Sequence, residues 1–149
     1  LAAQRALNLG FEKRQVHKQY VAVVQGLLAP PETDEGWGLI DLPLILDWLN
    51  RPRSIVDHEQ GRPSRTRWRV LAHDAAAGTT RVLLEPVTGR SHQLRVHLQA
   101  LGHPIVGDPL YAPAQETGST SRLLLHAQRL ALFHPATGTP MVFDSAPPF

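Results

Sequence analysis

Apolar and polar residues change their spacing several times along the chain, and each spacing predicts an element. Residues 1–16 repeat apolar side chains at helical spacing, although Gly10 weakens that pattern. Residues 18–25 are rich in β-branched side chains and stop at Gly26, which is typical of a strand. The N-terminal part is therefore predicted to be a helix followed by a strand.

The next segment, residues 27–64, is rich in turn-forming residues and gives a weaker pattern. Residues 42–46 are predicted to form a short strand, and Pro43 would place it at a sheet edge because proline cannot donate to a strand ladder. Residues 47–53 then read as a loop that carries arginines. We expect this region to be mostly connections.

Strict alternation follows in residues 65–72, where arginines fall on one face and Thr66, Trp68 and Val70 on the other. This pattern predicts a half-buried strand with a basic outer face. A hairpin loop over residues 73–78 and a return strand over residues 79–86 are expected next.

A helix is predicted for residues 91–101, with Ser91 as its N-cap and a stripe of leucines as its apolar face. Gly102 stands where a C-terminal glycine belongs, and Pro104 follows it. Residues 122–133 and 140–144 are predicted to form a closing antiparallel pair. The order of elements indicates an α+β fold with a mixed, mostly antiparallel central sheet and few flanking helices.

Composition narrows the class of protein. The chain has 149 residues, 42% of them hydrophobic and none of them cysteine, which suits one domain in a reducing compartment, and we expect the cytoplasm. Thirteen of its fifteen cationic side chains are arginines, whose planar fork matches phosphate oxygens. Arginine usage that follows genome composition is the alternative explanation. No apolar run is long enough to span a bilayer.

The most informative segment is residues 88–97, which read Thr-Gly-Arg-Ser-His-Gln-Leu-Arg-Val-His. A glycine-containing turn leads into a helix start, where backbone N–H groups favour an anion. Side-chain donors surround that point, and the predicted pocket residues here are Arg90, His92, Gln93 and Arg95. The alternative is an ordinary amphipathic helix with solvated polar side chains.

These residues resemble the Gly-Arg-x-His-Gln-Leu-Arg-x-His motif of RluA-type pseudouridine synthases. Three further segments are similar to that family in the same order: Lys-Gln-Tyr-Val-Ala-Val-Val-Gln-Gly (18–26), Gly-His-Pro-Ile-Val-Gly-Asp-Pro-Leu-Tyr (102–111) and Leu-Leu-Leu-His-Ala (123–127). Residues 41–52 resemble the group that modifies both 23S rRNA and tRNA. The similarity covers essentially the whole chain and implies one domain portion, residues 1–149, from the C-terminal part of a pseudouridine synthase catalytic domain.

The resemblance implies roles for single residues. Arg95 corresponds to the arginine that pairs with the family's catalytic aspartate, and Tyr20 to the tyrosine that packs against the flipped uracil. Leu125 corresponds to an aliphatic residue on the opposite side of the base pocket. An aromatic ring suits a flipped base because it offers a stacking partner. The alternatives for Tyr20 and Leu125 are ordinary core positions.

One departure from the family is plain. The His-Arg-Leu-Asp motif that carries the catalytic aspartate does not occur, and aligned on Tyr20 it would lie before Leu1. We therefore expect a fragment that is inactive alone, from an active parent enzyme. None of the aspartates present stands in that context; they are Asp34, Asp41, Asp47, Asp57, Asp74, Asp108 and Asp144.

The expected function is isomerisation of uridine to pseudouridine in structured RNA by a monomer, with 23S rRNA, tRNA or both as partner. No cofactor and no metal are implied, because nucleotide-binding and metal-binding motifs are absent from the sequence. The alternatives are a non-catalytic RNA-binding module and a phosphate-handling hydrolase. The candidate phosphate contacts are Arg51, Arg53, Arg62, Arg65, Arg67 and Arg69.

Overall fold

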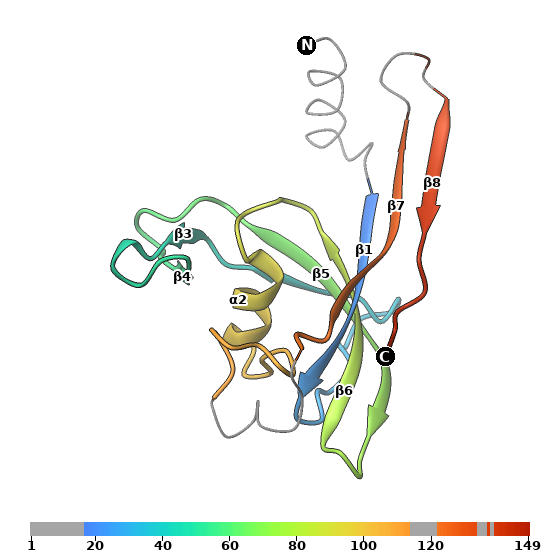
Figure 1. Cartoon of the computed structure of the whole chain (residues 1–149), viewed down its shortest axis with the longest axis horizontal. Helices are drawn as coiled ribbons and strands as arrows, with labels where there is room; N and C mark the ends of the chain where they lie inside the picture. The colour runs from blue at the N-terminus through green and yellow to red at the C-terminus, as the bar shows by residue number, and fades with distance from the viewer. Residues whose placement is uncertain (1–16, 114–121, 134–136, 138) are drawn as a thin grey trace.

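The structure, a computed structural model, describes residues 17–113, 122–133, 137 and 139–149. Its centre is a six-stranded sheet with the strand order β2-β5-β6-β1-β7-β8 (Figure 1). Every strand pairing in the described ranges is antiparallel, so the predicted antiparallel character is confirmed. The predicted helix over residues 1–16 lies outside the described residues.

The strands of the main sheet are β1 (His17–Gln25), β2 (Gly38–Asp41), β5 (Arg65–Asp74), β6 (Thr79–Pro86), β7 (Leu125–Phe133) and β8 (Pro140–Asp144). Five of these six follow the sequence prediction, and β6 has the predicted bounds. The short strand β2 was not predicted, because four residues carry too little alternation to stand out. Gly38 in β2 pairs with Trp68, and a Cβ there would lie 2.6 Å from the indole nitrogen, so a larger residue would displace the ring.

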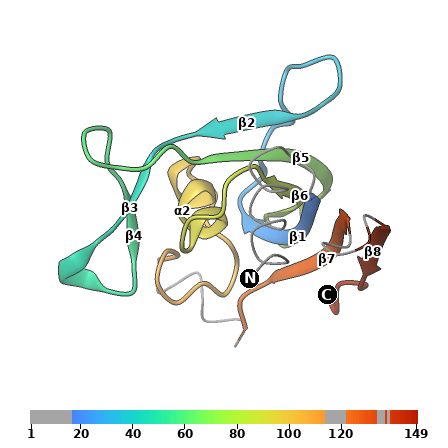
Figure 2. The same cartoon turned by 90° about the horizontal axis from the view of Figure 1, so that it is seen from above.

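A second, two-stranded sheet consists of β3 (Leu44–Leu46) and β4 (Ser54–Val56). It projects away from the main sheet, beyond the helix α2 (Gln93–Ala100) (Figure 2). Pro43 precedes β3 and accepts a hydrogen bond from the Asp57 N–H through its carbonyl. The predicted loop over residues 47–53 joins the two strands and contains one short helical turn, η1 (Trp48–Asn50).

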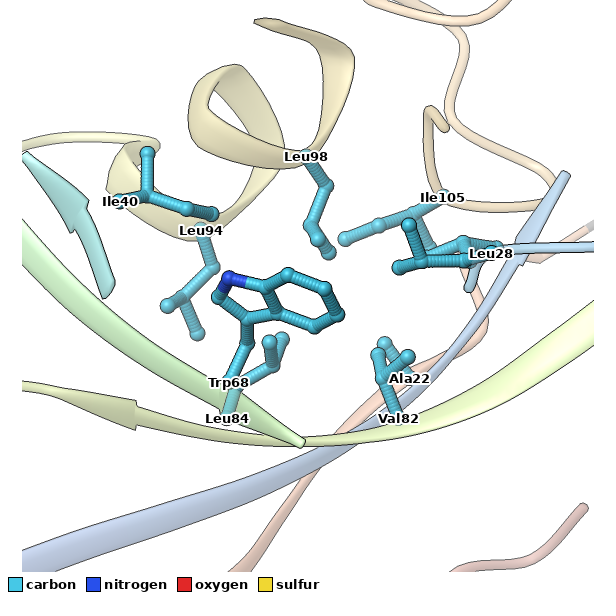
Figure 3. Packing of buried hydrophobic residues seen from close by; sticks show 10 residues of the cluster. Ala22, Leu28, Ile40, Trp68, Val82, Leu84, Leu94, Leu98 and Ile105 are labelled. Carbon is cyan, nitrogen blue, oxygen red and sulfur yellow. The ribbon is translucent and has the colours of Figure 1, made fainter. Parts of the chain in front are cut away.

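The core lies between α2 and one face of the main sheet. Leu94 and Leu98 of α2 pack on Trp68, with Leu84 and Val82 beneath (Figure 3). All of these side chains are buried, and full burial of each such side chain stabilises the fold by about 1.5–3 kcal/mol. Trp68 and Leu84 are direct cross-strand partners, as are Leu84 and Tyr20, so all three side chains lie on the α2 face of the sheet.

The helix ends as the sequence predicts. Gly102 has a φ of +86°, its N–H donates to the Gln99 carbonyl, and the His103 N–H donates to the Leu98 carbonyl. This pair of bonds is the Schellman arrangement, which satisfies carbonyls that the helix end would otherwise expose.

The start of the helix differs from the prediction. Ser91 is not the N-cap; α2 begins at Gln93, and the capping position is His92, in the left-handed region at φ 56°. The Ser91 carbonyl instead accepts a hydrogen bond from the Ser54 hydroxyl on β4. This contact joins residues 37 positions apart in sequence, so local capping preferences could not reveal it.

Candidate functional site

Gln93 holds the loop before α2 against β5. Its carbonyl oxygen accepts from the Thr88 hydroxyl (2.7 Å) and from the Arg90 N–H (3.0 Å). Its amide nitrogen donates to the Arg65 carbonyl and to the Thr66 hydroxyl. Four hydrogen bonds on one buried amide fill its capacity, so Gln93 shapes the loop by fixing both of its sides.

Arg95 projects from α2 and is fixed by a buried carboxylate. Its Nε donates to Oδ2 of Asp108 over 2.9 Å and its Nη2 to Oδ1 over 2.7 Å. Asp108 also accepts the N–H groups of Leu110 and Tyr111, and its side chain has no exposed surface. A bidentate pair of this kind fixes both the position and the plane of a guanidinium.

Electrostatics keep this pair ionised. Burial raises the pKa of Asp108, but the hydrogen bonds from Arg95 and from the backbone N–H groups outweigh burial and leave that pKa below its ordinary value. The hydrogen bond to Asp108 raises the pKa of Arg95. Within the described part of the chain, Nη1 of Arg95 has no hydrogen-bond partner. That nitrogen can therefore serve a second anionic group.

A chain of hydrogen bonds sets the protonation of His92. The Tyr111 hydroxyl accepts the Ser54 N–H over 2.8 Å and lies 2.9 Å from Nδ1 of His92. Among the described residues, Nδ1 of His92 is the one acceptor within reach of the Tyr111 hydroxyl proton. We therefore assign the donation from Tyr111 to Nδ1, which places the ring proton of neutral His92 on Nε2. Burial, followed by the charge of Arg95, lowers the pKa of His92, which favours this neutral form.

The side chains of His92, Gln93 and Arg95 border a cavity of about 270 Å³, which we call the first hollow. Its size lies near the lower end of the roughly 300–1,000 Å³ typical of ligand pockets, and suits a single small ring. The residues of the lining that the structure describes include cationic Lys18 but no carboxylate. All six residues predicted to form the catalytic and substrate pocket line it: Tyr20, Arg90, His92, Gln93, Arg95 and Leu125.

Strand register explains how Tyr20 and Leu125 come together. Tyr20 pairs with Leu84 on one side and with Ala127 on the other, while Leu125 pairs with Ala22. Tyr20 and Ala22 are two positions apart, so their side chains and that of Leu125 share the face covered by α2. Lys18 stands two positions before Tyr20 on the same strand, so its side chain shares that face and also lines the hollow.

The structure divides the six predicted phosphate contacts into two groups. Arg65, Arg67 and Arg69, the strand arginines, lie on the face of β5 that points away from α2, because Thr66 and Trp68 occupy the inner face. Arg65 pairs with Asp41 and Arg67 with Glu85, while Trp37 lies under Arg67 and Arg69. The first hollow is on the opposite face of the sheet.

The other three arginines lie near the two-stranded sheet. The Arg51 guanidinium stacks 4.1 Å from the Trp48 ring centre, and Arg53 lies 5.4 Å from that of Tyr111. Arg62 is anchored through its backbone, which exchanges hydrogen bonds with Leu44. Figure 2 shows the β3–β4 sheet beside α2.

Sequence reasoning missed three residues of the site: Asp108, Ser54 and Tyr111. Asp108 and Tyr111 were within reach, because both stand in the Gly-Asp-x-x-Tyr turn that the sequence shares with the RluA-type family. Ser54 carried no signal, since it stands outside the shared motifs and both of its contacts here, the N–H to Tyr111 and the hydroxyl to the Ser91 carbonyl, are made to residues distant in sequence. The described residues contain neither a cluster of potential metal ligands nor a helix long and apolar enough to cross a membrane.

Comparisons with known proteins place the chain in one family. The family model described as RNA pseudouridylate synthase matches residues 1–100. The chain is 50% identical over 148 residues to the dual-specificity RNA pseudouridine synthase RluA of Escherichia coli K12, covering 99% of this chain and 65% of that protein. It is 51% identical over 142 residues to the RluA of Yersinia pestis, covering 95% and 66%.

A solved structure, human RNA pseudouridylate synthase domain containing 1, superimposes with a TM-score of 0.76 at 32% identity. The match covers 99% of this chain and 61% of that one. The chain thus spans about two thirds of the length of its relatives. Fold, motif order and sequence identity together show that it belongs to the RNA pseudouridylate synthase family.

Proposed function

We propose that residues 1–149 are the C-terminal part of a pseudouridine synthase catalytic domain that acts on uridine in structured RNA. The observation that carries the proposal is the first hollow, where Tyr20, Leu125 and Arg95 meet in a chain of this family. The two bacterial relatives named above are dual-specificity RNA pseudouridine synthases, which supports RNA as the substrate. The proposal includes 23S rRNA, tRNA or both as that RNA, and a cytoplasmic monomer as the working form.

The proposed reaction breaks the N1–C1′ bond of uridine, turns the base and joins C5 to C1′. The proton on C5 leaves and N1 gains one, so the reaction is redox-neutral. A base that turns must stay in place while it is unattached. The ring of Tyr20 and the side chain of Leu125 offer apolar surfaces for that purpose, and the small volume of the hollow limits escape.

Arg95 supplies fixed positive charge beside the base. Its Nη1 is the part of the guanidinium that Asp108 leaves unused, and it can hold the carboxylate of a catalytic aspartate in the ionised form. Asp108 itself is a positioning residue, since all of its partners are in the protein and it has no exposed surface. We do not assign it the role of the nucleophile.

Neutral His92 adds a directed donor. Its Nε2–H is the ring proton not used by Tyr111, and the side chain lines the hollow. A neutral donor can contact an oxygen of the bound nucleotide without adding a charge that would compete with Arg95.

The test is release of tritium from RNA that contains uridine labelled at C5, because that hydrogen leaves only when carbon takes the place of nitrogen. The protein assayed is the product of the complete reading frame that contains residues 1–149. We expect release together with pseudouridine in the digested RNA. If the protein binds RNA but releases no tritium, the proposed enzymatic activity is wrong and the alternative of a non-catalytic RNA-binding module remains.

A further inference from the structure

We propose that a second hollow next to the first receives the nucleotide that adjoins the target uridine in the same RNA strand. This inference rests on the proposed function, and it assigns the substrate contacts on the hairpin side of the site. The second hollow has a volume of about 460 Å³ and lies between the two-stranded sheet and the loop before α2.

The two hollows share a wall. Gly89 and Arg90 line both, so a chain that leaves the first hollow across this wall enters the second. A Cβ built on Gly89 would meet nothing within 4 Å, which means that the wall is bare at that point and a backbone can approach it closely. Two neighbouring nucleotides can occupy the two hollows only if the RNA backbone that joins them can pass over the wall between.

Arg90 is held at this divide. Its Nε and Nη2 both donate to the Pro63 carbonyl, over 3.2 and 3.0 Å, and its N–H donates to Gln93. These bonds fix the side chain along the border and leave Nη1 for a phosphate. The phosphate that joins two adjacent nucleotides would lie here, above a cation whose position is already set.

The lining of the second hollow fits the rest of a nucleotide. Leu46 of β3, whose side chain is exposed, gives an apolar surface for a base, and Gln60 offers an amide for its polar edge. Arg62 adds a second cation, and its backbone bonds to Leu44 keep it beside that surface. Among the described residues, no carboxylate lines either hollow. A nucleotide matches this lining, because its base can pack on the apolar surface and its phosphate can contact the two arginines, whereas a purely apolar ligand would leave the arginines without a partner.

The first experiment measures affinity. A fluorescein-labelled RNA hairpin with a uridine in its loop is titrated with the complete reading-frame product. Leu46→Asp places a negative charge in the second hollow and should weaken binding roughly tenfold, as expected for the loss of one stacked nucleotide. The matched control is Leu71→Asp: both leucines are exposed strand residues, and Leu71 lines neither hollow.

A second pair of variants tests the charge. Arg62→Ala should weaken binding and lower the dependence of affinity on salt, because one phosphate contact is lost. Arg129→Ala removes an exposed arginine on β7 that lines neither hollow, and should leave affinity and salt dependence unchanged. Equal effects of the two members in both pairs would overturn the second hollow as a nucleotide site.

Photo-crosslinking separates this inference from the proposed function. 4-Thiouridine replaces either the target uridine or a flanking nucleotide, and the crosslinked peptides are identified by mass spectrometry. We expect the target label on peptides containing Tyr20 or Leu125, and a flanking label on peptides containing residues 44–46 or 60–62. A target label in the first hollow with both flanking labels elsewhere overturns the second hollow alone. A target label that never reaches the first hollow contradicts the proposed function.

Discussion

Arginines in this chain meet two different environments. The pocket-side arginines, Arg62, Arg90 and Arg95, border the two hollows. The guanidinium of Arg95 is fixed by a buried carboxylate and that of Arg90 by the Pro63 carbonyl, whereas Arg62 is held through its backbone. The strand arginines lie on the opposite face of the sheet, and Arg65 and Arg67 there pair with carboxylates at the surface. Arginines of equal charge therefore differ in what they can do: one whose guanidinium is fixed beside a pocket can serve a reaction, whereas one on the outer face of the sheet that pairs with a neighbouring carboxylate mainly balances charge.

The largest effect should come from Arg95. Arg95→Ala in the complete reading-frame product should lower kcat about 100- to 1,000-fold, as expected when one directed electrostatic contact is lost. Arg67→Ala, the matched change on the strand face, should stay within a factor of about two. Initial rates of tritium release from uridine-labelled RNA measure both. Similar decreases in kcat for the two variants would contradict the proposed difference between the pocket face and the outer face of the sheet.

The carboxylate partners should differ in the same direction. Asp108→Asn leaves Arg95 without its buried counter-charge and should lower the free energy of unfolding by about 3 kcal/mol. Glu85→Gln, at the more exposed Arg67 pair, should cost no more than about 1 kcal/mol. Urea denaturation followed by circular dichroism measures both variants.

Acid should act through the same carboxylate. Because the folded-state pKa of Asp108 lies below its ordinary value, the stabilisation is complete above the ordinary pKa and is lost as the pH falls through the depressed one. In Asp108→Asn this contribution is absent, so the difference in unfolding free energy between variant and parent should shrink in strong acid. A difference that stays constant with pH would contradict the ionised pair.

The hydrogen-bond chain on the pocket side offers a smaller effect. Tyr111→Phe leaves the buried Ser54 N–H without its acceptor and should cost about 1–3 kcal/mol of stability. In the parent, nitrogen NMR at neutral pH should show the ring proton of His92 on Nε2, and the variant should lose that preference. A proton on Nδ1 in the parent would reverse the proposed direction of donation.

The shifted pKa of His92 makes the free energy of unfolding depend on pH. It is lowered in the folded protein, so the unfolded chain takes up a proton first as the pH falls through the ordinary histidine range. The free energy of unfolding should therefore decrease there as acid is added. Burial lowers the pKa of His97 as well, so the fit of the titration needs two histidines.

The smallest effect should come from reversing the strand arginines. Arg67→Glu with Arg69→Glu should change the slope of log affinity against log salt by less than about 0.5, because each phosphate contact to single-stranded RNA contributes about 0.7. A decrease of more than one unit in hairpin titrations would show that RNA reaches around to the back of the sheet, as the sequence alone suggests.

The sequence predicts the elements whose stabilising pattern is local. The alternation in residues 65–72, the bounds of β6 and the glycine at the end of α2 all depend on neighbours a few positions away. The start of α2 depends on Ser54, which approaches from a distant strand, and the prediction there is wrong. Strand β2 is missed for the same reason, since it exists through its pairing with β5.

The site follows a similar rule. Shared motifs bring together Tyr20, Arg95 and Leu125, and the structure places all three around one hollow. What the sequence cannot give is the partner of each polar atom. The Gly-Asp-x-x-Tyr turn sets Asp108 apart from the other six aspartates, but its burial and its four incoming hydrogen bonds are visible only in the structure.

The pair of Arg95 and Asp108 spans 13 positions along the chain, and the capped end of α2 lies between the two residues. Closing so short a loop costs little entropy, so this unit can assemble early, ahead of the distant strand pairings. The Arg95 guanidinium would then be fixed in position before the strands that form the rest of the first hollow have paired. In that case a newly made chain would form the buried ion pair first, and the strands that line the rest of the site would pair around it afterwards.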